Sequence, residues 1–213
     1  MRDYARNERV FSTGDVCDGL SVIVEGSISV TKNINGKDAL LGVFAAPFWI
    51  GEVSIIDGDG RQHDVTADHP LRVLHVPMPA VEALLARRPD FYRHLGLLIS
   101  TKLRLAISAL HESSVEAMLV RLASRLLIMA SAHGSWTDRT ALNLQVSQEQ
   151  LAAMLGTSRQ TVSVNLRELE TRGAIRIAYG RIELLDVAAL KQLASARDEA
   201  TPMPRAARTQ NAA

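Results

Sequence analysis

Residues Ser147–Gly173, SQEQLAAMLGTSRQTVSVNLRELETRG, decide the fold of the C-terminal part of this chain. Small and apolar residues recur at helical spacing in its first half, at Leu151, Ala152 and Leu155. Ser147, with Gln150 three residues later, forms the sequence pattern of a capping box. Gly156 is well suited to end this helix, because glycine adopts the left-handed conformation at low cost. The pattern predicts a helix over residues 148–155, followed by a sharp turn.

A second helix is predicted directly after the turn. Thr157 and Gln160 suggest a second capping box, and the helix would end at Gly173. Its inward face would carry Val162, Leu166 and Leu169. Two helices joined by so short a turn are typical of the helix-turn-helix, whose second helix lies in the major groove of DNA. The alternative is a helical hairpin with a solvated polar face, but the paired capping signals favour the DNA-binding motif.

The exposed start of the second helix carries residue types that read bases. Arg159 can pair with guanine, Gln160 can pair with adenine, and Val164 can contact the methyl group of thymine. After Gly173, alternating apolar residues surround Tyr179-Gly180, which indicates a hairpin, or wing, with Arg181 near its tip. The predicted DNA-contacting residues are Ser147, Thr157, Ser158, Arg159, Gln160, Ser163, Val164, Arg167 and Arg181.

Composition limits the other classes of function. The chain has 213 residues, 47% hydrophobic and 22% charged, with a net charge of +1, which is typical of a folded protein. Cys17 is the only cysteine, so an internal disulfide and a cysteine-bound iron–sulfur cluster are excluded. The sequence shows no signal peptide or apolar run of membrane-spanning length, so we expect a cytoplasmic protein without a membrane partner. It also lacks the motifs of a nucleophile, a metal centre or a phosphate loop, so we expect no enzymatic activity.

The N-terminal part is predicted to be a β structure. Short apolar or alternating runs occur at residues 9–12, 20–24, 27–31, 39–44 and 71–76, separated by turn signals. Asn35-Gly36 is a strong signal for a two-residue hairpin. Many short strands at this spacing predict a sandwich or barrel with a central pocket. The fold class is therefore α+β.

A long helix is predicted between the two parts, from Pro89 to about Ser113. It carries an apolar stripe with a 4-4-3-4 spacing at Leu95, Ile99, Leu103, Ala106 and Leu110. Such a stripe is typical of a coiled coil and predicts a homodimer, although the helix could instead bury this face in its own domain. We expect an effector domain at residues 1–88, a dimerisation helix at 89–114, a winged helix-turn-helix at 115–194 and a disordered tail at 195–213.

The predicted order is a β domain, a long helix and a winged helix-turn-helix. In this order the chain resembles members of the superfamily of the cyclic-AMP receptor protein and the fumarate-nitrate regulator (Crp/Fnr). The most specific part is SRQTVSVNLRELETRGAI, and Gly14-Asp15, Gly26 and Gly51-Glu52 add to the likeness. The resemblance implies a cyclic-nucleotide-binding-like β-roll, a long dimerisation helix and a C-terminal winged helix-turn-helix. It also implies a homodimer that binds a palindromic promoter site in double-stranded DNA and acts on RNA polymerase.

The sequence does not decide which effector, if any, the N-terminal domain binds. The resemblance places Gly51 and Glu52 at the ribose hydroxyls of a cyclic nucleotide and Arg61 at its phosphate, but Gln62 and His63 follow where small residues are needed. A regulator with a vestigial pocket, independent of an effector or controlled by a partner, is the alternative. A haem-based gas sensor is a third reading, which the scattered histidines do not favour, since no two have helical i, i+4 spacing. These are His63, His69, His75, His94, His111 and His133.

Overall fold

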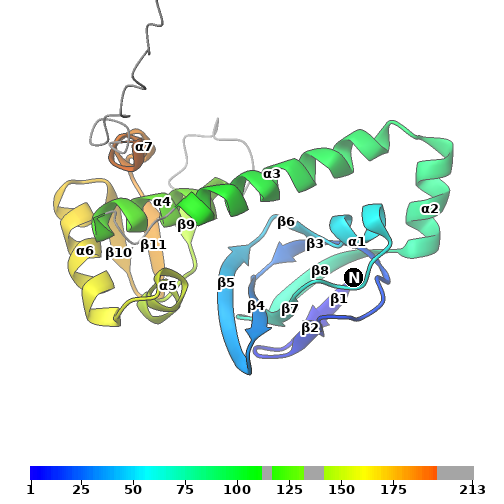
Figure 1. The fold of residues 1–213 in the computed structure, drawn as a ribbon, viewed down its shortest axis with the longest axis horizontal. Helices are drawn as coiled ribbons and strands as arrows, with labels where there is room; N and C mark the ends of the chain where they lie inside the picture. The colour runs from blue at the N-terminus through cyan, green and yellow to red at the C-terminus, as the bar shows by residue number, and fades with distance from the viewer. Residues whose placement is uncertain (112–116, 132–141, 196–213) are drawn as a thin grey trace, which may run out of the picture.

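The computed structural model consists of two bodies joined by a long helical segment (Figure 1). It describes residues 1–111, 117–131 and 142–195. The predicted tail lies outside the described residues from position 196 onward, and so do His133 and the predicted end of the dimerisation helix at 112–114.

The N-terminal body, here called the β domain, is a sandwich of two four-stranded antiparallel sheets with the orders β1-β8-β3-β6 and β2-β7-β4-β5. Its strands are β1 (Arg2–Tyr4), β2 (Arg9–Phe11), β3 (Gly19–Glu25), β4 (Ser27–Ile34), β5 (Lys37–Ala45), β6 (Phe48–Ile50), β7 (Asp64–Ala67) and β8 (Leu71–Pro77). A short helix, α1 (Glu52–Asp57), follows β6. Alternate residues of both sheets form the core, including Ile23, Ile28, Val65 and Val73. The predicted sandwich is confirmed.

Local turn chemistry explains the hairpin between β4 and β5. Ile34 pairs with Lys37, and both Asn35 and Gly36 have positive φ, as the predicted two-residue turn requires. The prediction missed the three-residue strands β1 and β6, and also β7 and α1. Segments this short contain too few residues to show a periodicity.

Two helices follow the sandwich, α2 (Met78–Arg87) and α3 (Phe91–His111). The long predicted helix is confirmed, but one member of its apolar stripe is not where the spacing placed it. Leu95 is buried against Val81 and Leu85 of α2, in a core cluster of the same chain. On this helix apolar residues occur on more than one face, so the spacing alone did not separate the inward face from the outward one.

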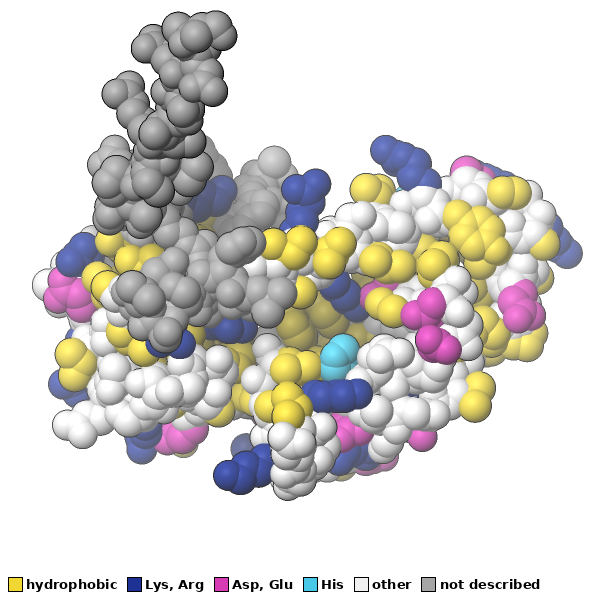
Figure 2. Space-filling model, in the orientation of Figure 1, with side chains coloured by type: hydrophobic (Ala, Val, Ile, Leu, Met, Phe, Trp, Pro, Cys, Tyr) yellow, Lys and Arg dark blue, Asp and Glu magenta, His cyan; other side chains and the backbone are white. Residues whose placement is uncertain are grey.

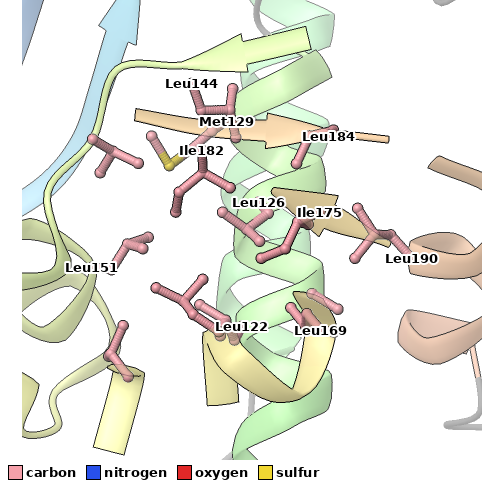
Figure 3. Close-up of a cluster of buried hydrophobic side chains, with 14 of the residues drawn as sticks. Leu122, Leu126, Met129, Leu144, Leu151, Leu169, Ile175, Ile182, Leu184 and Leu190 are labelled. Atoms are coloured by element: carbon pink, nitrogen blue, oxygen red, sulfur yellow. The ribbon is translucent and has the colours of Figure 1, made fainter. Parts of the chain in front are cut away.

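The C-terminal body, here called the helical domain, contains α4 (Met118–Ser131), α5 (Gln148–Leu155), α6 (Arg159–Thr171), α7 (Val187–Ser195) and the sheet β10-β11-β9. Its strands are β9 (Leu142–Leu144), β10 (Ile175–Ala178) and β11 (Arg181–Leu184). Figure 3 shows Leu122, Leu126 and Met129 of α4 facing side chains from the other elements. This single apolar cluster holds α5 and α6 in place.

The two bodies also touch directly, away from the long helix. Val43 of β5 is only 1% exposed, because it is buried in the apolar cluster of the helical domain. Figure 1 shows α5 on the side of the helical domain that faces β5. The β domain therefore contacts the helix-turn-helix without an intermediate.

Candidate nucleic-acid interface and effector site

The helix-turn-helix begins with a complete capping box. The Ser147 hydroxyl accepts a hydrogen bond from the Gln150 N–H at 3.1 Å, and the Ser147 N–H donates to Gln150 Oε1 at 2.8 Å. Gly156 ends α5 in the left-handed conformation with φ of 62°. The sequence predicted both features, because both depend on neighbouring residues alone.

The predicted second capping box at Thr157 is wrong. Ser158 is the N-cap of α6, in an extended conformation, and its hydroxyl accepts from the Thr161 N–H at 3.1 Å. The turn uses Thr157 differently, since its N–H donates to the Ala152 carbonyl at the end of α5. α6, the second helix of the helix-turn-helix, therefore begins one residue later than the sequence pattern placed it.

α6 has one buried and one exposed face. Val162, Leu166 and Leu169 are fully buried, whereas Val164 is 61% exposed. The other predicted contacts lie on or beside the outward face. Arg159, Gln160 and Arg167 are exposed, and Ser163 is half-buried.

Arg159 is held by a weak partner. Its Nε lies 3.0 Å from Glu149 Oε1 on α5, and both side chains are largely exposed to solvent. An ion pair in this setting contributes little free energy, so a nucleic acid can replace it at small cost.

The wing is present as predicted. Strands β10 and β11 pair from Ile175↔Leu184 to Ala178↔Arg181, with Tyr179 and Gly180 in the turn. Tyr179 is fully exposed. Arg181 and Arg176 both lie beside Glu183, at 3.4 Å and 3.1 Å. Arg176 was not predicted, and it adds a second cation to the wing.

The wing, α5 and α6 surround a cleft of about 630 Å³ whose remaining wall comes from the β domain. Arg159, Ser147 and Arg181 line it on one side, and Asp68 and His69 line it on the other. In addition, Gln150 Nε2 donates a hydrogen bond to Asp68 Oδ1 at 2.8 Å. This contact joins residues that are 82 positions apart, and the sequence carried no signal for it.

The predicted effector site lies on the other side of the β domain, beside α3. Gly51 has φ of 109°, and a Cβ there would lie 2.8 Å from Arg61 Nη1, so the position needs glycine. Glu52 follows at the start of α1 and is only 1% exposed. Its Oε1 lies 2.7 Å from Nζ of Lys102 on α3, and its Oε2 is buried without a hydrogen-bond partner.

Arg61 is buried beneath the same site. Its Nη2 donates to Asp18 Oδ1 at 3.0 Å and to the Gly19 carbonyl at 3.3 Å, and its guanidinium stacks 4.4 Å above the ring of Phe11. Burial alone would raise the pKa of Asp18, but Arg2, His75 and Arg61 together hold that pKa below its usual value.

Gln62 and His63, which follow Arg61, differ in exposure. Gln62 is exposed, and its carbonyl accepts from Lys32 Nζ at 2.7 Å. His63 is half-buried, and burial together with the charges of Lys32 and Lys102 lowers its pKa. Lys102 was not predicted, although it brings a cation from the long helix directly to Glu52.

The outward face of α3 is apolar. Leu103 is 57% exposed, Ala106 and Ile107 are exposed, and Ile99 is half-buried. The side chain of Leu110 lies outside the described residues. Figure 2 shows hydrophobic side chains on the surface over α2 and α3. A separate apolar pocket of about 500 Å³ lies between α2, α3 and the sheet, and it is lined by residues such as Trp49, Leu84 and Leu98.

In residues 1–111, 117–131 and 142–195, no group of three His, Cys, Asp or Glu side chains is arranged to hold a metal ion. No helix within these ranges is both long and apolar enough to cross a membrane.

Two family models match this chain. The cyclic nucleotide-binding domain matches residues 1–88, and the Crp-like helix-turn-helix domain matches residues 120–193. The chain belongs to the Crp/Fnr family of transcription regulators. The protein is accordingly a DNA-binding regulator with an N-terminal domain of the cyclic-nucleotide-binding type.

Other members of the Crp/Fnr family align over most of the chain. The CRP-like cAMP-activated global transcriptional regulator of Mycobacterium tuberculosis is 28% identical over 178 residues, which cover 82% of this chain and 79% of the relative. The cyclic AMP receptor protein of Thermus thermophilus is 28% identical over 196 residues, or 91% and 87% of the two chains. The structure of FixK2 from Bradyrhizobium japonicum, at 18% identity, has a TM-score of 0.72 and covers 90% of this chain and 95% of its own. That likeness concerns the fold alone.

Proposed function

We propose that this Crp/Fnr-family regulator acts in the cytoplasm as a homodimer that binds a palindromic promoter site and modulates transcription through RNA polymerase. The strongest support for this proposal is the set of side chains that α6 exposes. Its buried apolar face leaves Arg159 and Gln160 exposed in the first turn and Val164 exposed in the second. In a helix-turn-helix, the first residues of the second helix contact the base edges.

Each exposed residue has a role that follows from its chemistry. Arg159 donates two hydrogen bonds to guanine, Gln160 pairs with adenine, and Val164 packs against a thymine methyl group. Arg167 and Arg181 neutralise phosphates, which position the helix but do not specify sequence. The small hydroxyl residues complete the backbone contacts. They are Ser147, Thr157, Ser158 and Ser163.

The dimer would form along α3. The exposed Leu103, Ala106 and Ile107 lie on one outward face of a 21-residue helix, and Ile99 continues it toward the N-terminus. Pairing two such helices removes this apolar area from water and places the two copies of α6 around a two-fold axis. A palindromic site with half-sites one helical turn apart is the expected match.

Control of DNA binding is proposed to pass through the β domain. This domain contacts α3 through Lys102 and contacts α5 through Asp68 and Val43. A change in the conformation of the β domain would therefore alter the positions of both α3 and the helix-turn-helix. Such a change would shift the fraction of molecules whose conformation can bind DNA.

Selection from a random double-stranded DNA library, together with sedimentation equilibrium, tests the proposal. We expect an enriched palindrome whose half-sites are about 10 base pairs apart and a dimer in solution. The variant Arg159→Ala removes one of the proposed base contacts. Its matched control is Arg172→Ala, because Arg172 lies at the opposite end of α6 and pairs with Glu168. A monomer, or a protein that enriches no sequence, would contradict the proposal.

A further inference from the structure

The two charged residues that the family resemblance assigns to a cyclic nucleotide both have internal partners. Glu52 pairs with Lys102, and Arg61 pairs with Asp18. We propose that Lys102 and Asp18 are specificity-determining residues that close this site to cyclic nucleotides. Lys102 takes the place of the ribose hydroxyls at Glu52, and Asp18 takes the place of the phosphate at Arg61.

Lys102 is bound by three different groups. Its ammonium lies 2.7 Å from Glu52 Oε1, donates to the Trp49 carbonyl at 2.7 Å and lies 4.6 Å from the centre of the Phe48 ring. A hydroxyl that approached Glu52 Oε1 would have to displace this ammonium, and Glu52 Oε2, although it has no hydrogen-bond partner, is itself buried. Because burial already lowers the pKa of Lys102, with Glu52 opposing that effect, an ammonium that lost its carboxylate there would be strongly disfavoured.

Arg61 offers an anion little access. Its Nη2 is already used by Asp18 and by the Gly19 carbonyl, and one face of its guanidinium is covered by Phe11. Its Nη1 is buried without a hydrogen-bond partner, but it lies against the backbone of Gly51. A phosphate could reach the guanidinium only if the Asp18 carboxylate moved away, and both are negatively charged.

Both internal partners have an advantage over a free ligand. Lys102 and Asp18 belong to the same chain as the groups they bind, so their pairing is intramolecular and has a high effective concentration. The residues present therefore do not fit a cyclic nucleotide in this arrangement. On this proposal the chain would not respond to cyclic AMP, unlike the cAMP-activated regulator of Mycobacterium tuberculosis and the cyclic AMP receptor protein of Thermus thermophilus.

Thermal unfolding and calorimetric titration of the full chain with a large excess of cyclic AMP or cyclic GMP test the inference. We expect no shift of the wild-type melting temperature. The double variant Lys102→Ala/Asp18→Ala frees Glu52 and Arg61, and it should gain a saturable upward shift. The matched control Arg104→Ala/Asp3→Ala removes one charge of each sign at exposed positions and should behave as the wild type does.

A saturable shift of the wild type with either nucleotide would overturn the inference. A folded double variant that still shows no shift would also overturn it, because other residues would then close the site. If the alanine variant does not fold, Lys102→Met/Asp18→Asn keeps the side-chain volumes and is judged by the same two outcomes.

The DNA-binding readout rests on the proposed function, and it separates the two ideas. Wild-type protein that binds its selected DNA equally well with and without nucleotide supports the inference. Wild-type protein that binds no DNA contradicts the proposed function and leaves the nucleotide titrations to decide the inference by themselves. DNA affinity that rises on addition of a nucleotide contradicts the inference alone.

Discussion

Replacing Gln150 with Glu should weaken the contact between the helical domain and the β domain without removing the cap of α5. In the structure, Gln150 Oε1 accepts from the Ser147 N–H, while Gln150 Nε2 donates to Asp68 Oδ1 at 2.8 Å. Glutamate at this position still offers an oxygen to Ser147, and it is the usual partner in a capping box. Toward Asp68, however, it replaces a donor with a second carboxylate.

The magnitude follows from the burial of the pair. The Asp68 side chain is 19% exposed, and a hydrogen bond to a charged group in such a setting is worth about 1.5–3 kcal/mol. Two carboxylates about 4 Å apart add a repulsion of up to about 4 kcal/mol at an effective dielectric constant near 20. The lost hydrogen bond and the repulsion together predict a loss of at least about 1.5 kcal/mol and at most about 7 kcal/mol.

Urea unfolding followed by circular dichroism measures this loss, and a swapped pair provides the control. In Asp68→Asn/Gln150→Glu, an amide donates to a carboxylate in the opposite direction, so most of the lost free energy should return. Asp68→Asn alone should cost about 1 kcal/mol, because an amide oxygen can still accept from Gln150. If Gln150→Glu is as stable as the wild type, or if the swap restores nothing, the contact does not join the domains in solution.

Three further outcomes are expected. Arg159→Ala should weaken binding to the selected DNA by about 1–3 kcal/mol in fluorescence anisotropy and relax the preference at one base, whereas Arg172→Ala should not. Leu166→Ala should reduce the free energy of unfolding by about 2–5 kcal/mol, measured by urea unfolding, because Leu166 is fully buried in the cluster below α6. Burial lowers the pKa of His75 below 6.5 despite the nearby Asp18 carboxylate, so the unfolded chain binds the proton more readily. Stability should therefore fall as the pH drops below 6.5, and His75→Gln should flatten part of that slope in pH-dependent melting curves.

The parts of the fold that the sequence predicted depend on neighbouring residues. The Ser147 capping box, the left-handed Gly156 and the Asn35-Gly36 hairpin each follow from the chemistry of four or fewer consecutive residues. The error at Thr157 is of the same kind, because Ser158 is an equally good N-cap residue and only the geometry of the turn chooses between them.

The parts that the sequence did not predict depend on residues far apart in the chain. Lys102 lies 50 positions from Glu52, and Asp18 lies 43 positions from Arg61. No periodicity or motif connects such pairs, so the sequence did not link Lys102 to Glu52 or Asp18 to Arg61. The prediction that Leu95 lies on the dimerisation stripe was wrong for a related reason. Helical spacing groups residues on one face of a helix without showing what that face contacts.

These long-range contacts bear on how the regulator can respond to a signal. Lys102 joins α3 to β6 and α1, while Val43 and the Gln150–Asp68 bond join the β domain to the helix-turn-helix. Arg159, Arg181 and Asp68 line the same cleft, so DNA entering beside the wing would meet the carboxylate of the β domain. A signal that weakens the Asp68 contact would therefore free the cleft. The Asp68→Ala variant removes both the bond to Gln150 and this carboxylate, so it should bind the selected DNA more tightly than the wild type does.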